Sequence, residues 1–387
     1  MRSEYNYLPQ QFPKLPSDVL NLLQHSADSG NITAKIFLRW ADISERGDFT
    51  LGREVGEFES NWSAVVGSKY SIGTSNGTDS IALALEAAGL QPGEEVVTTP
   101  VSFEATSGAI IQAGGKPVLV DVDRPAAPNI TQEKINYEYA AEKRPKWCVP
   151  VLWAGSPERM DKWSGHTILD AAQGINARVR GKRLGELPGI TAATYSLHPL
   201  KNINVWGDGG MIATNDMGLD HELRSLRNHG LVGRDIWERP GYNHRLSTLQ
   251  AAVGLEVLET FDFMNDGRQR NAAVLTEGIN GINGVTPPYV AEGDTHGWHL
   301  YQIIVDAGDR DDCVRYLNAH GVEAKVHYPV PLHLQPALRG LGYARGDFPN
   351  AEAFCDQNVT LPINEYLTVE QMEYTVETLA AWARAGA

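Results

Sequence analysis

Residues 95–122, EVVTTPVSFEATSGAIIQAGGKPVLVDV, hold the pattern that decides the fold. The β-branched run at 95–99 ends at Pro100, an apolar segment with helical spacing occupies 102–113, and a second strand-like run covers 116–122. A strand, a helix and a strand in this order predict a βαβ unit, in which a helix joins two parallel strands and covers one face of the sheet.

The same alternation continues on both sides of this unit. A helix is expected at 78–88, strands are expected at 147–153 and 167–169, and helical spacing is also found at 17–47 and 54–66. Strands separated by helices predict an α/β fold with a largely parallel sheet. Ligands of such sheets bind beyond the carboxyl ends of the strands, so polar side chains that follow a strand are the first candidates for a site.

The pattern changes in the last third of the chain. The sequence predicts a long helix from residue 246, a strand at 299–305, a helix at 311–319, a strand at 322–326 and a last helix at 368–385. A chain of 387 residues is longer than one core usually fills. We therefore expect a large domain at 1–255, including an N-terminal helical segment, and a smaller domain at 256–387.

Composition and charge exclude several classes of protein. The chain is 42% hydrophobic and 21% charged, as an ordinary globular protein is, and its net charge of −15 argues against a general nucleic-acid binder. The three cysteines lack the spacing of zinc or redox motifs, so no disulfide framework is expected. Residues 1–16 lack the apolar core of a secretory signal, and no apolar run reaches the roughly 18 residues of a membrane span, which predicts a cytoplasmic protein.

The first candidate for a binding site is the turn GTSNGTDS at 73–80, which runs directly into a helix. Unpaired amides and the positive end of the helix dipole suit a phosphate group. The alternative is an ordinary helix start, with Asn76 or Thr78 as the capping residue. No Gly-Lys-Ser/Thr follows, so the turn is not a Walker A loop.

The second candidate is Asp170, which follows the strand at 167–169 and opens the run DAAQ. A carboxylate at the end of a buried strand needs a partner, because burying an unpaired charge is costly. A protonated pyridine nitrogen is one such partner, and pyridoxal phosphate (PLP) chemistry needs an acidic group there. The alternative is an aspartate that caps the next helix.

The third candidate is Lys201, in SLHPLKN at 196–202, which is followed by WGDGG at 206–210. A lone lysine before a glycine-rich turn is usually a surface residue. A Schiff-base lysine, however, must be partly desolvated and rigidly placed. Pro199 stiffens the approach to Lys201, and the glycines let the backbone pass close to a bound ring.

Four motifs taken together resemble the DegT-type family of sugar aminotransferases. They are SNGTDS at 75–80, ILDAAQG at 168–174, YSLHPLKN with WGDGG at 195–210, and GYNHRLSTLQAAVGLEVLE at 241–259. The resemblance implies the aspartate-aminotransferase fold of PLP enzymes. That is a three-layer fold with a mixed, mostly parallel sheet in the large domain and a smaller α+β C-terminal domain. It also implies pyridoxal 5'-phosphate as cofactor and a homodimer with shared active sites.

The resemblance also implies roles for single residues around the cofactor ring. Lys201 would form the Schiff base and carry the proton at the substrate carbon. Asp170 would pair with the pyridinium nitrogen, and Gln173 would reach the phenolic oxygen. Phe103 matches the aromatic position that stacks on the ring.

The remaining implied contacts concern the phosphate and the substrate. The phosphate would be bound by Gly77, Thr78, Ser196 and by Asn243 from the neighbouring subunit. His327 matches a position that often contacts the sugar, and Arg245 and His198 are further candidates for substrate contacts.

The resemblance implies transfer of an amino group, with L-glutamate as the usual donor, to a nucleotide-linked keto-deoxysugar. Four alternatives remain beside it. A free cyclitol or another ring ketone could be the acceptor. A PLP-dependent sugar dehydratase would commonly carry histidine in place of Lys201. A PLP-binding regulator would lack turnover, and a metal site of His320, His327 and His333 would lack the usual ligand spacing.

Overall fold

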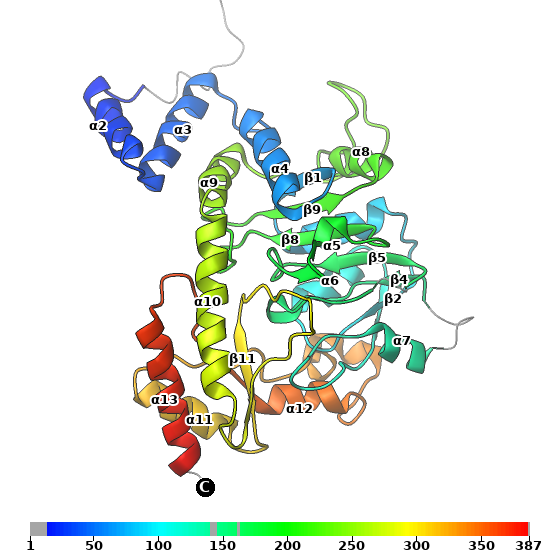
Figure 1. The fold of residues 1–387 in the computed structure, drawn as a ribbon. Coiled ribbons are helices and arrows are strands. Elements are labelled where there is room, and N and C mark those ends of the chain that lie inside the picture. The colour runs from blue at the N-terminus through cyan, green and yellow to red at the C-terminus, as the bar shows by residue number, and fades with distance from the viewer. Residues whose placement is uncertain (1–13, 140–144, 161–162, 386–387) are drawn as a thin grey trace, which may run out of the picture.

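The computed structural model describes residues 14–139, 145–160 and 163–385 (Figure 1). The expectation about a secretory signal concerns residues 1–16, of which 1–13 lie outside the described residues. Within the described ranges, no helix is both long and apolar enough to cross a membrane.

A seven-stranded sheet forms the centre of the N-terminal part. Its strands lie in the order β1 (Tyr70–Thr74), β9 (Gly210–Thr214), β8 (Ala192–Ser196), β5 (His166–Asp170), β4 (Trp147–Cys148), β2 (Glu95–Thr98) and β3 (Lys116–Leu119). β9 runs antiparallel to both of its neighbours, whereas the pairs from β8 to β3 are parallel. The expected mixed, mostly parallel sheet is confirmed.

Helices cover both faces of this sheet and produce three layers. On one face lie α5 (Gly77–Ala87), α6 (Glu104–Gln112) and α8 (Met217–Leu226), and on the other α4 (Arg53–Val66) and α9 (Thr248–Leu258). Successive strand residues point to opposite faces. Ile168 therefore packs in the core under α5, α6 and α8, and Leu169 packs in the core under α4 and α9. A further helix, α7 (Gln132–Glu138), covers Val97 and Cys148 near the sheet edge.

The N-terminal segment 17–47 forms two helices where a single helical stretch was expected. They are α2 (Ser17–Asp28) and α3 (Ile32–Arg46). Gly30 adopts a left-handed φ of 91°, and the Asn31 side chain accepts a hydrogen bond from Ala34 N at 3.0 Å. This turn ends one helix and caps the next, so α2 extends away from the sheet (Figure 1).

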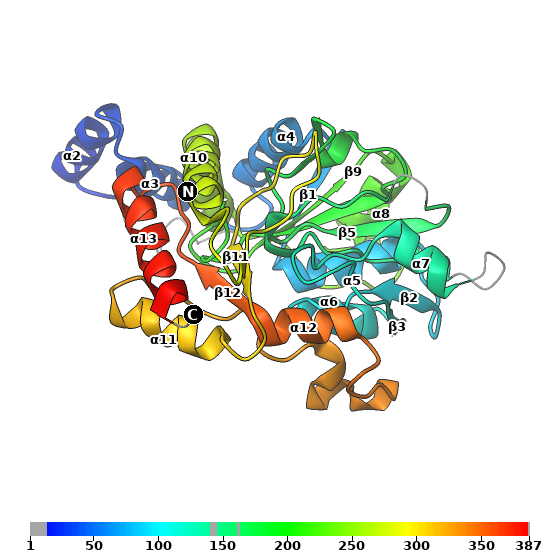
Figure 2. The same cartoon turned by 60° about the horizontal axis from the view of Figure 1, so that its bottom comes forward.

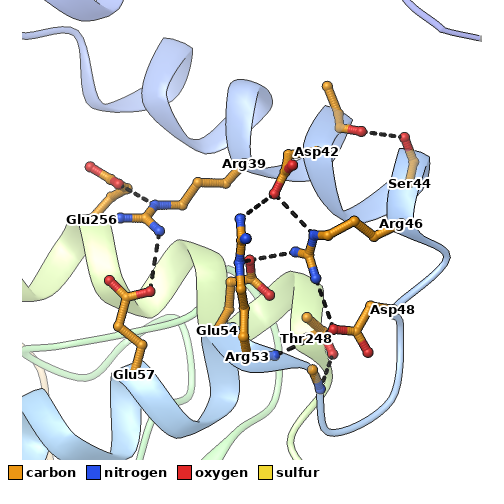
Figure 3. A network of polar contacts seen from close by, with 12 residues as sticks. Arg39, Asp42, Ser44, Arg46, Asp48, Arg53, Glu54, Glu57, Thr248 and Glu256 are labelled. Carbon is orange, nitrogen blue, oxygen red and sulfur yellow. Dashed lines mark hydrogen bonds and ion pairs between the residues drawn. The ribbon is translucent and has the colours of Figure 1, made fainter.

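Ion pairs attach α3 to the central helices (Figure 3). Arg39 Nε lies 2.5 Å from Oε1 of the buried Glu256 on α9, and Arg46 Nη2 lies 2.6 Å from Oε1 of the buried Glu54 on α4. Each carboxylate is buried but paired, which is the arrangement that makes a buried charge tolerable. α3 is thereby fixed against both α4 and α9.

The C-terminal part has its own sheet and core. β10 (Val285–Thr286), β11 (Tyr301–Val305) and β12 (Asn358–Leu361) form an antiparallel sheet that packs with α10 (Phe261–Ile279), α11 (Arg310–Ala319) and α13 (Val369–Ala385). Another helix, α12 (Pro349–Gln357), packs against the large sheet's edge, where Phe354 and Ala351 meet Leu119 and Val101 (Figure 2). Shorter elements are β6 (Arg178–Val179), β7 (Lys182–Arg183), η2 (Trp153–Gly155), η3 (Leu184–Glu186), η4 (Leu332–Leu334) and η5 (Pro336–Leu341).

Two expectations for this part were wrong or incomplete. Residues 322–326 form no strand, because the segment meets β12 only at Lys325, which exchanges both backbone hydrogen bonds with Thr360. The expected long helix from residue 246 is followed by a second one, α10, whose polar composition hid it. The predicted domain boundary near residue 256 falls within α9 and stays a prediction.

Glu158 carries a buried carboxyl group. The residue is 8% exposed, and burial raises the pKa of Glu158 to about 8. Hydrogen bonds from Arg159 N, at 2.9 Å, and from the Asn129 side chain oppose this rise without cancelling it. The folded chain therefore holds a proton on Glu158 at neutral pH.

We expect Glu158→Gln to remove a pH dependence of stability. From pH 4.5, the ordinary pKa, to about pH 8 the folded chain binds a proton that the unfolded chain releases. The free energy of unfolding of the parent should thus fall as pH rises, by up to about 1.4 kcal/mol per pH unit. Denaturant unfolding at several pH values should show the variant gaining on the parent towards pH 8. The same gain for Glu373→Gln, at an exposed carboxylate on α13 that does not act on Glu158, would contradict this assignment.

Candidate active site

Four of the predicted site residues, Asp170, Gln173, Ser196 and Lys201, lie at one edge of the large sheet. The neighbouring parallel strands β5 and β8 end there at Asp170 and Ser196. The loops that follow carry Gln173 and Lys201. A small cavity at this edge is lined by Gln173, Ser196 and Lys201 together with residues of the core.

Asp170 is an almost fully buried acid, 4% exposed. Its Oδ2 accepts a hydrogen bond from Thr106 Oγ1 at 2.7 Å, and its Oδ1 accepts one from Ala172 N at 3.1 Å. Burial raises the pKa of Asp170, while these hydrogen bonds and the charge of Lys201 oppose the rise. A protonated ring nitrogen would be a favourable partner for such a group, because it would compensate the buried negative charge.

Lys201 lies in a loop that is closed by backbone hydrogen bonds. Its own N–H donates to His198 O at 2.8 Å, and the N–H of Leu197 donates to Gly209 O at 2.8 Å. Burial lowers the pKa of the Lys201 amine, and the nearby Asp170 partly opposes this. A depressed pKa leaves more of the amine neutral, which is the form that attacks a carbonyl carbon.

The turn before α5 combines a helix cap with a close approach of two backbones. Asn76 caps the helix, since its side chain accepts from Asp79 N at 2.8 Å. A Cβ atom at Gly77 would lie 2.8 Å from Ser196 Cβ, so the close contact between these two segments requires glycine. Asn76 is thus the capping residue of the helix. The start of the helix at Gly77 and Thr78 lies against Ser196, as an anion site would need.

Gln173 is held with a defined amide orientation. Its Oε1 accepts a hydrogen bond from Ala154 N at 2.6 Å, which leaves the NH2 group to donate elsewhere. Ala154 has a positive φ of 58° inside η2, a conformation that few residues with a Cβ adopt. The turn at η2 thus points one backbone N–H at Gln173.

Phe103 is exposed at the start of α6 and faces one aromatic ring of the C-terminal part. It is 58% exposed, and its ring centroid lies 6.0 Å from that of Tyr328. Tyr328 also packs against Trp153, with centroids 5.5 Å apart. Nothing in the amino-acid sequence singles out Tyr328 except that it follows His327.

The substrate candidates differ in how the structure places them. His327 is half-buried, its Nδ1 lies 3.0 Å from Thr360 Oγ1, and burial and the charges of Lys325 and Lys201 lower its pKa. His198 is exposed and accepts from Leu200 N at 3.2 Å, and Arg245 donates to Asn228 Oδ1 at 2.8 Å.

Asn243 is exposed on a loop held by backbone hydrogen bonds between Tyr242 O and His229 N and between His244 N and Arg227 O. Within the described ranges, no hydrogen bond or ion pair joins the side chains of His198, Arg245 or Asn243 to that of Lys201. Their predicted roles stay predictions.

Sequence reasoning missed two groups of residues around the site. One is Thr106 with Ser102, whose hydroxyls lie 2.7 Å apart and extend the hydrogen bonding of Asp170. The other is a buried ion pair, Glu59 with Arg227, that holds the end of β1. Both nitrogen and oxygen of Gly73 are bound, since Gly73 N donates to Glu59 Oε1 at 2.8 Å and Arg227 Nη1 donates to Gly73 O at 2.6 Å.

We expect Glu59→Ala to lower the free energy of unfolding by about 3 kcal/mol or more, because it leaves Arg227 buried without its partner. Denaturant unfolding measures this change. The control is Glu57→Ala, which breaks an exposed pair with Arg39 at 3.6 Å and should cost less than about 1 kcal/mol. Equal losses in the two variants would contradict the role of the buried pair.

His, Cys, Asp and Glu side chains of the described residues form no group of three or more that could hold a metal ion. His333 instead lies 3.1 Å from Glu352, and His320 Nδ1 lies 2.8 Å from Tyr316 O.

Comparison with known proteins gives consistent matches over most of the chain. A sequence model of the DegT/DnrJ/EryC1/StrS aminotransferase family matches residues 31–380. The "Pleiotropic regulatory protein" of Geobacillus stearothermophilus is 38% identical, covering 89% of this chain and 93% of that protein. The dTDP-3-amino-3,4,6-trideoxy-alpha-D-glucose transaminase of Streptomyces venezuelae is 33% identical, with 89% and 90% covered. The crystal structure of S. venezuelae DesV in complex with a ketimine intermediate has a TM-score of 0.85 at 31% identity, with 96% and 99% covered.

The chain belongs to the DegT/DnrJ/EryC1/StrS aminotransferase family, as its motifs indicated. Solved structures with this fold include one with bound PMP and one described as a PLP form. The chain is accordingly a pyridoxal-phosphate-dependent aminotransferase. Its residues fit that cofactor: a half-buried amine with a lowered pKa suits the aldehyde, a buried acid suits the ring nitrogen, and the glycine held against Ser196 suits the phosphate.

Proposed function

We propose that this aminotransferase moves an amino group from L-glutamate to the ketone carbon of a nucleotide-linked keto-deoxysugar. The observation that carries the proposal is that Lys201, whose pKa is lowered, and the buried Asp170 interact through their charges at the edge where β5 and β8 end. The activity of the S. venezuelae relative, a transaminase of a dTDP-linked deoxysugar, supports the choice of acceptor.

The roles proposed for the ring contacts follow from the chemistry of each side chain. When bound, the cofactor supplies an electron sink for the bond broken at the substrate carbon. Asp170 would keep the ring nitrogen protonated, and Gln173 would donate its NH2 group to the phenolic oxygen. Lys201 would move the proton between the substrate carbon and C4′ of the cofactor. Phe103 would cover one face of the ring.

The phosphate contacts are proposed to come from two subunits. Gly77 and Thr78 would donate their amides, and Ser196 and Thr78 their hydroxyls. Asn243 of the partner subunit would complete the site in a homodimer. The exposed position of the loop at 241–245 and its firm backbone pairing support this, since a residue that reaches into a neighbour must be both accessible and held.

We expect Asn243→Ala to weaken retention of the cofactor, and Lys201→Ala to be inactive. Mixing the two variants under conditions of subunit exchange should restore part of the activity, because one of the two mixed sites would carry both intact residues. Each variant alone serves as control, and mass spectrometry confirms the exchange. Complete exchange without recovered activity would contradict the shared site.

The acceptor is proposed to be oriented by His327, with Arg245 and His198 as further contacts. A free cyclitol or another ring ketone is the second candidate for the acceptor. A dehydratase is disfavoured because Lys201 is retained at the position that such enzymes commonly replace. A regulator without turnover is the third candidate, because the G. stearothermophilus relative is called a pleiotropic regulatory protein.

Two measurements test this function. Purified protein is first mixed with L-glutamate, and loss of the visible absorption band should report conversion to the pyridoxamine form, which a non-catalytic binder would not show. The protein is then assayed with glutamate against a panel of keto-sugar nucleotides and cyclitol ketones. Turnover of a keto-sugar nucleotide supports the proposal, whereas turnover of cyclitol ketones alone would replace it by the second candidate.

A further inference from the structure

The segment 295–300 of the C-terminal part lies against both loops that form the active site. Gly297 N donates to Gly155 O at 2.7 Å, and His299 N donates to Ala154 O at 2.9 Å. These bonds fix the turn whose N–H orients Gln173. The backbone of segment 295–300 therefore holds one of the two active-site loops in place.

The same segment also holds the lysine loop through a side chain. Asn202 follows Lys201 directly, and its Nδ2 donates to Gly297 O at 3.1 Å. Its Oδ1 lies 3.0 Å from His299 Nδ1. Because a backbone carbonyl can only accept, the amide orientation of Asn202 is fixed and Oδ1 must face the imidazole. His299 must therefore carry a proton on Nδ1.

The surroundings of His299 keep the ring neutral. Burial lowers its pKa well below the ordinary value, and the nearby positive charges of Lys201 and Arg268, together with His327, lower it further. A neutral ring with its proton on Nδ1 has an unprotonated Nε2. This tautomer follows from the hydrogen bond to Asn202.

A second histidine in the segment provides an internal comparison. His296 is 3% exposed, and its Nδ1 accepts a hydrogen bond from Trp298 N at 2.9 Å. Burial lowers the pKa of His296 to about 3, so its neutral ring carries the proton on Nε2. The ring stacks on Trp298 with centroids 3.9 Å apart. The two histidines thus have opposite tautomers, and only His299 contacts the lysine loop through its ring.

We propose that His299 is a positioning residue for Lys201: its Nδ1–H holds Asn202, and thereby fixes the lysine loop to the C-terminal part of the chain. The inference rests on the proposed function insofar as Lys201 is the residue that bonds the cofactor. Asn202 is anchored twice, to His299 and to Gly297. Loss of the imidazole contact leaves Asn202 with only the bond to Gly297, so the residue next to Lys201 is held less firmly, and a displaced amine reacts more slowly.

Three variants separate positioning from other roles. His299→Leu removes the donor. His299→Asn keeps an N–H donor close to the place of Nδ1 and lacks Nε2. His296→Leu is the matched control, because it removes a buried neutral histidine from the same segment without touching Asn202. The first readout is a rate measured with apoprotein. Pyridoxal 5'-phosphate is added, and borohydride reduction at successive times fixes the cofactor that has bonded to Lys201. The second is the pH titration of the absorption band of the loaded protein.

For His299→Leu we expect capture slowed by about tenfold and a shifted titration midpoint. His299→Asn should recover most of both values, and His296→Leu should keep both near those of the parent even if it melts at a lower temperature. A parent-like His299→Leu would overturn the proposal. So would a His299→Asn variant as impaired as His299→Leu, since the defect would then reside in Nε2.

A direct measurement covers the case in which His299→Leu does not fold. Nitrogen-15 spectra of the histidine side chains of the intact protein report which ring nitrogen bears the proton. We expect Nδ1–H at His299 and Nε2–H at His296, and the His299 signal is assigned through its loss in His299→Asn. A proton on Nε2 of His299 would overturn the inference. Failure of the parent itself to capture cofactor at Lys201 would instead reject the proposed function.

Discussion

Replacing Lys201 by alanine is expected to abolish transamination, with a loss of about 10⁴-fold or more, because one side chain supplies both the bond to the cofactor and the proton transfer. The visible band of the cofactor bound to the lysine should vanish as well. The fold should persist, since the loop is closed by backbone hydrogen bonds from Lys201 N to His198 O and from Leu197 N to Gly209 O. Absorbance spectra, circular dichroism and the glutamate half-reaction measure these three outcomes.

Two further variants sharpen this result. Lys201→Arg keeps a positive charge but should be equally inactive, because the guanidinium stays protonated and does not attack the aldehyde. Lys116→Ala, at an exposed lysine paired with Glu95 at 3.0 Å, should behave as the parent does. Full activity in Lys201→Ala would remove the lysine from the mechanism.

The second large effect is expected for Asp170→Asn. The amide has nearly the shape of the acid but no negative charge, so it cannot keep a proton on the ring nitrogen. We expect the rate of the glutamate half-reaction to fall by about 10²–10³-fold, as for the loss of a preorganised electrostatic contact. Stopped-flow absorbance under single-turnover conditions measures it.

The control for this variant is another buried aspartate that follows a strand of the same sheet. Asp121 follows β3 and is 5% exposed, but its carboxylate accepts hydrogen bonds from Asn350 N at 3.0 Å and Ala351 N at 2.9 Å, at the start of α12. Asp121→Asn should therefore lower stability and leave the half-reaction nearly unchanged. If the two variants slowed the half-reaction equally, the special role of Asp170 would be rejected.

The location of these two acids explains why only one belongs to the site. Asp170 and Asp121 are both buried carboxylates at the ends of parallel strands. Their burial alone therefore does not show which of them belongs to the active site. Asp170 lies on a central strand beside β8 and near the lysine loop, whereas Asp121 follows the edge strand β3 and binds a helix of the C-terminal part. The position of its strand in the sheet thus determines whether a carboxylate lies in the active site or binds another part of the fold.

The sequence by itself determined those helices, strands and motifs whose pattern is contained in consecutive residues. The βαβ pattern at 95–122 predicted a parallel sheet because strand and helix periodicities differ and are written in consecutive residues. The candidates Asp170, Gln173 and Lys201 were found for the same reason, since each lies in a short motif next to a strand. Local signals failed at α10, whose polar composition hid the helix, and at 322–326, where apolar residues pack without extended pairing.

Only the tertiary structure decided which distant residues support these candidates. Thr106 reaches Asp170 across 64 positions, Glu59 reaches Arg227 across 168, and Asn202 reaches His299 across 97. A hydrogen bond between such residues leaves no periodic trace in the sequence, because its geometry depends on how strands and helices pack. The amino-acid sequence therefore indicates which side chains carry the chemistry, whereas the tertiary structure determines which residues hold them in place.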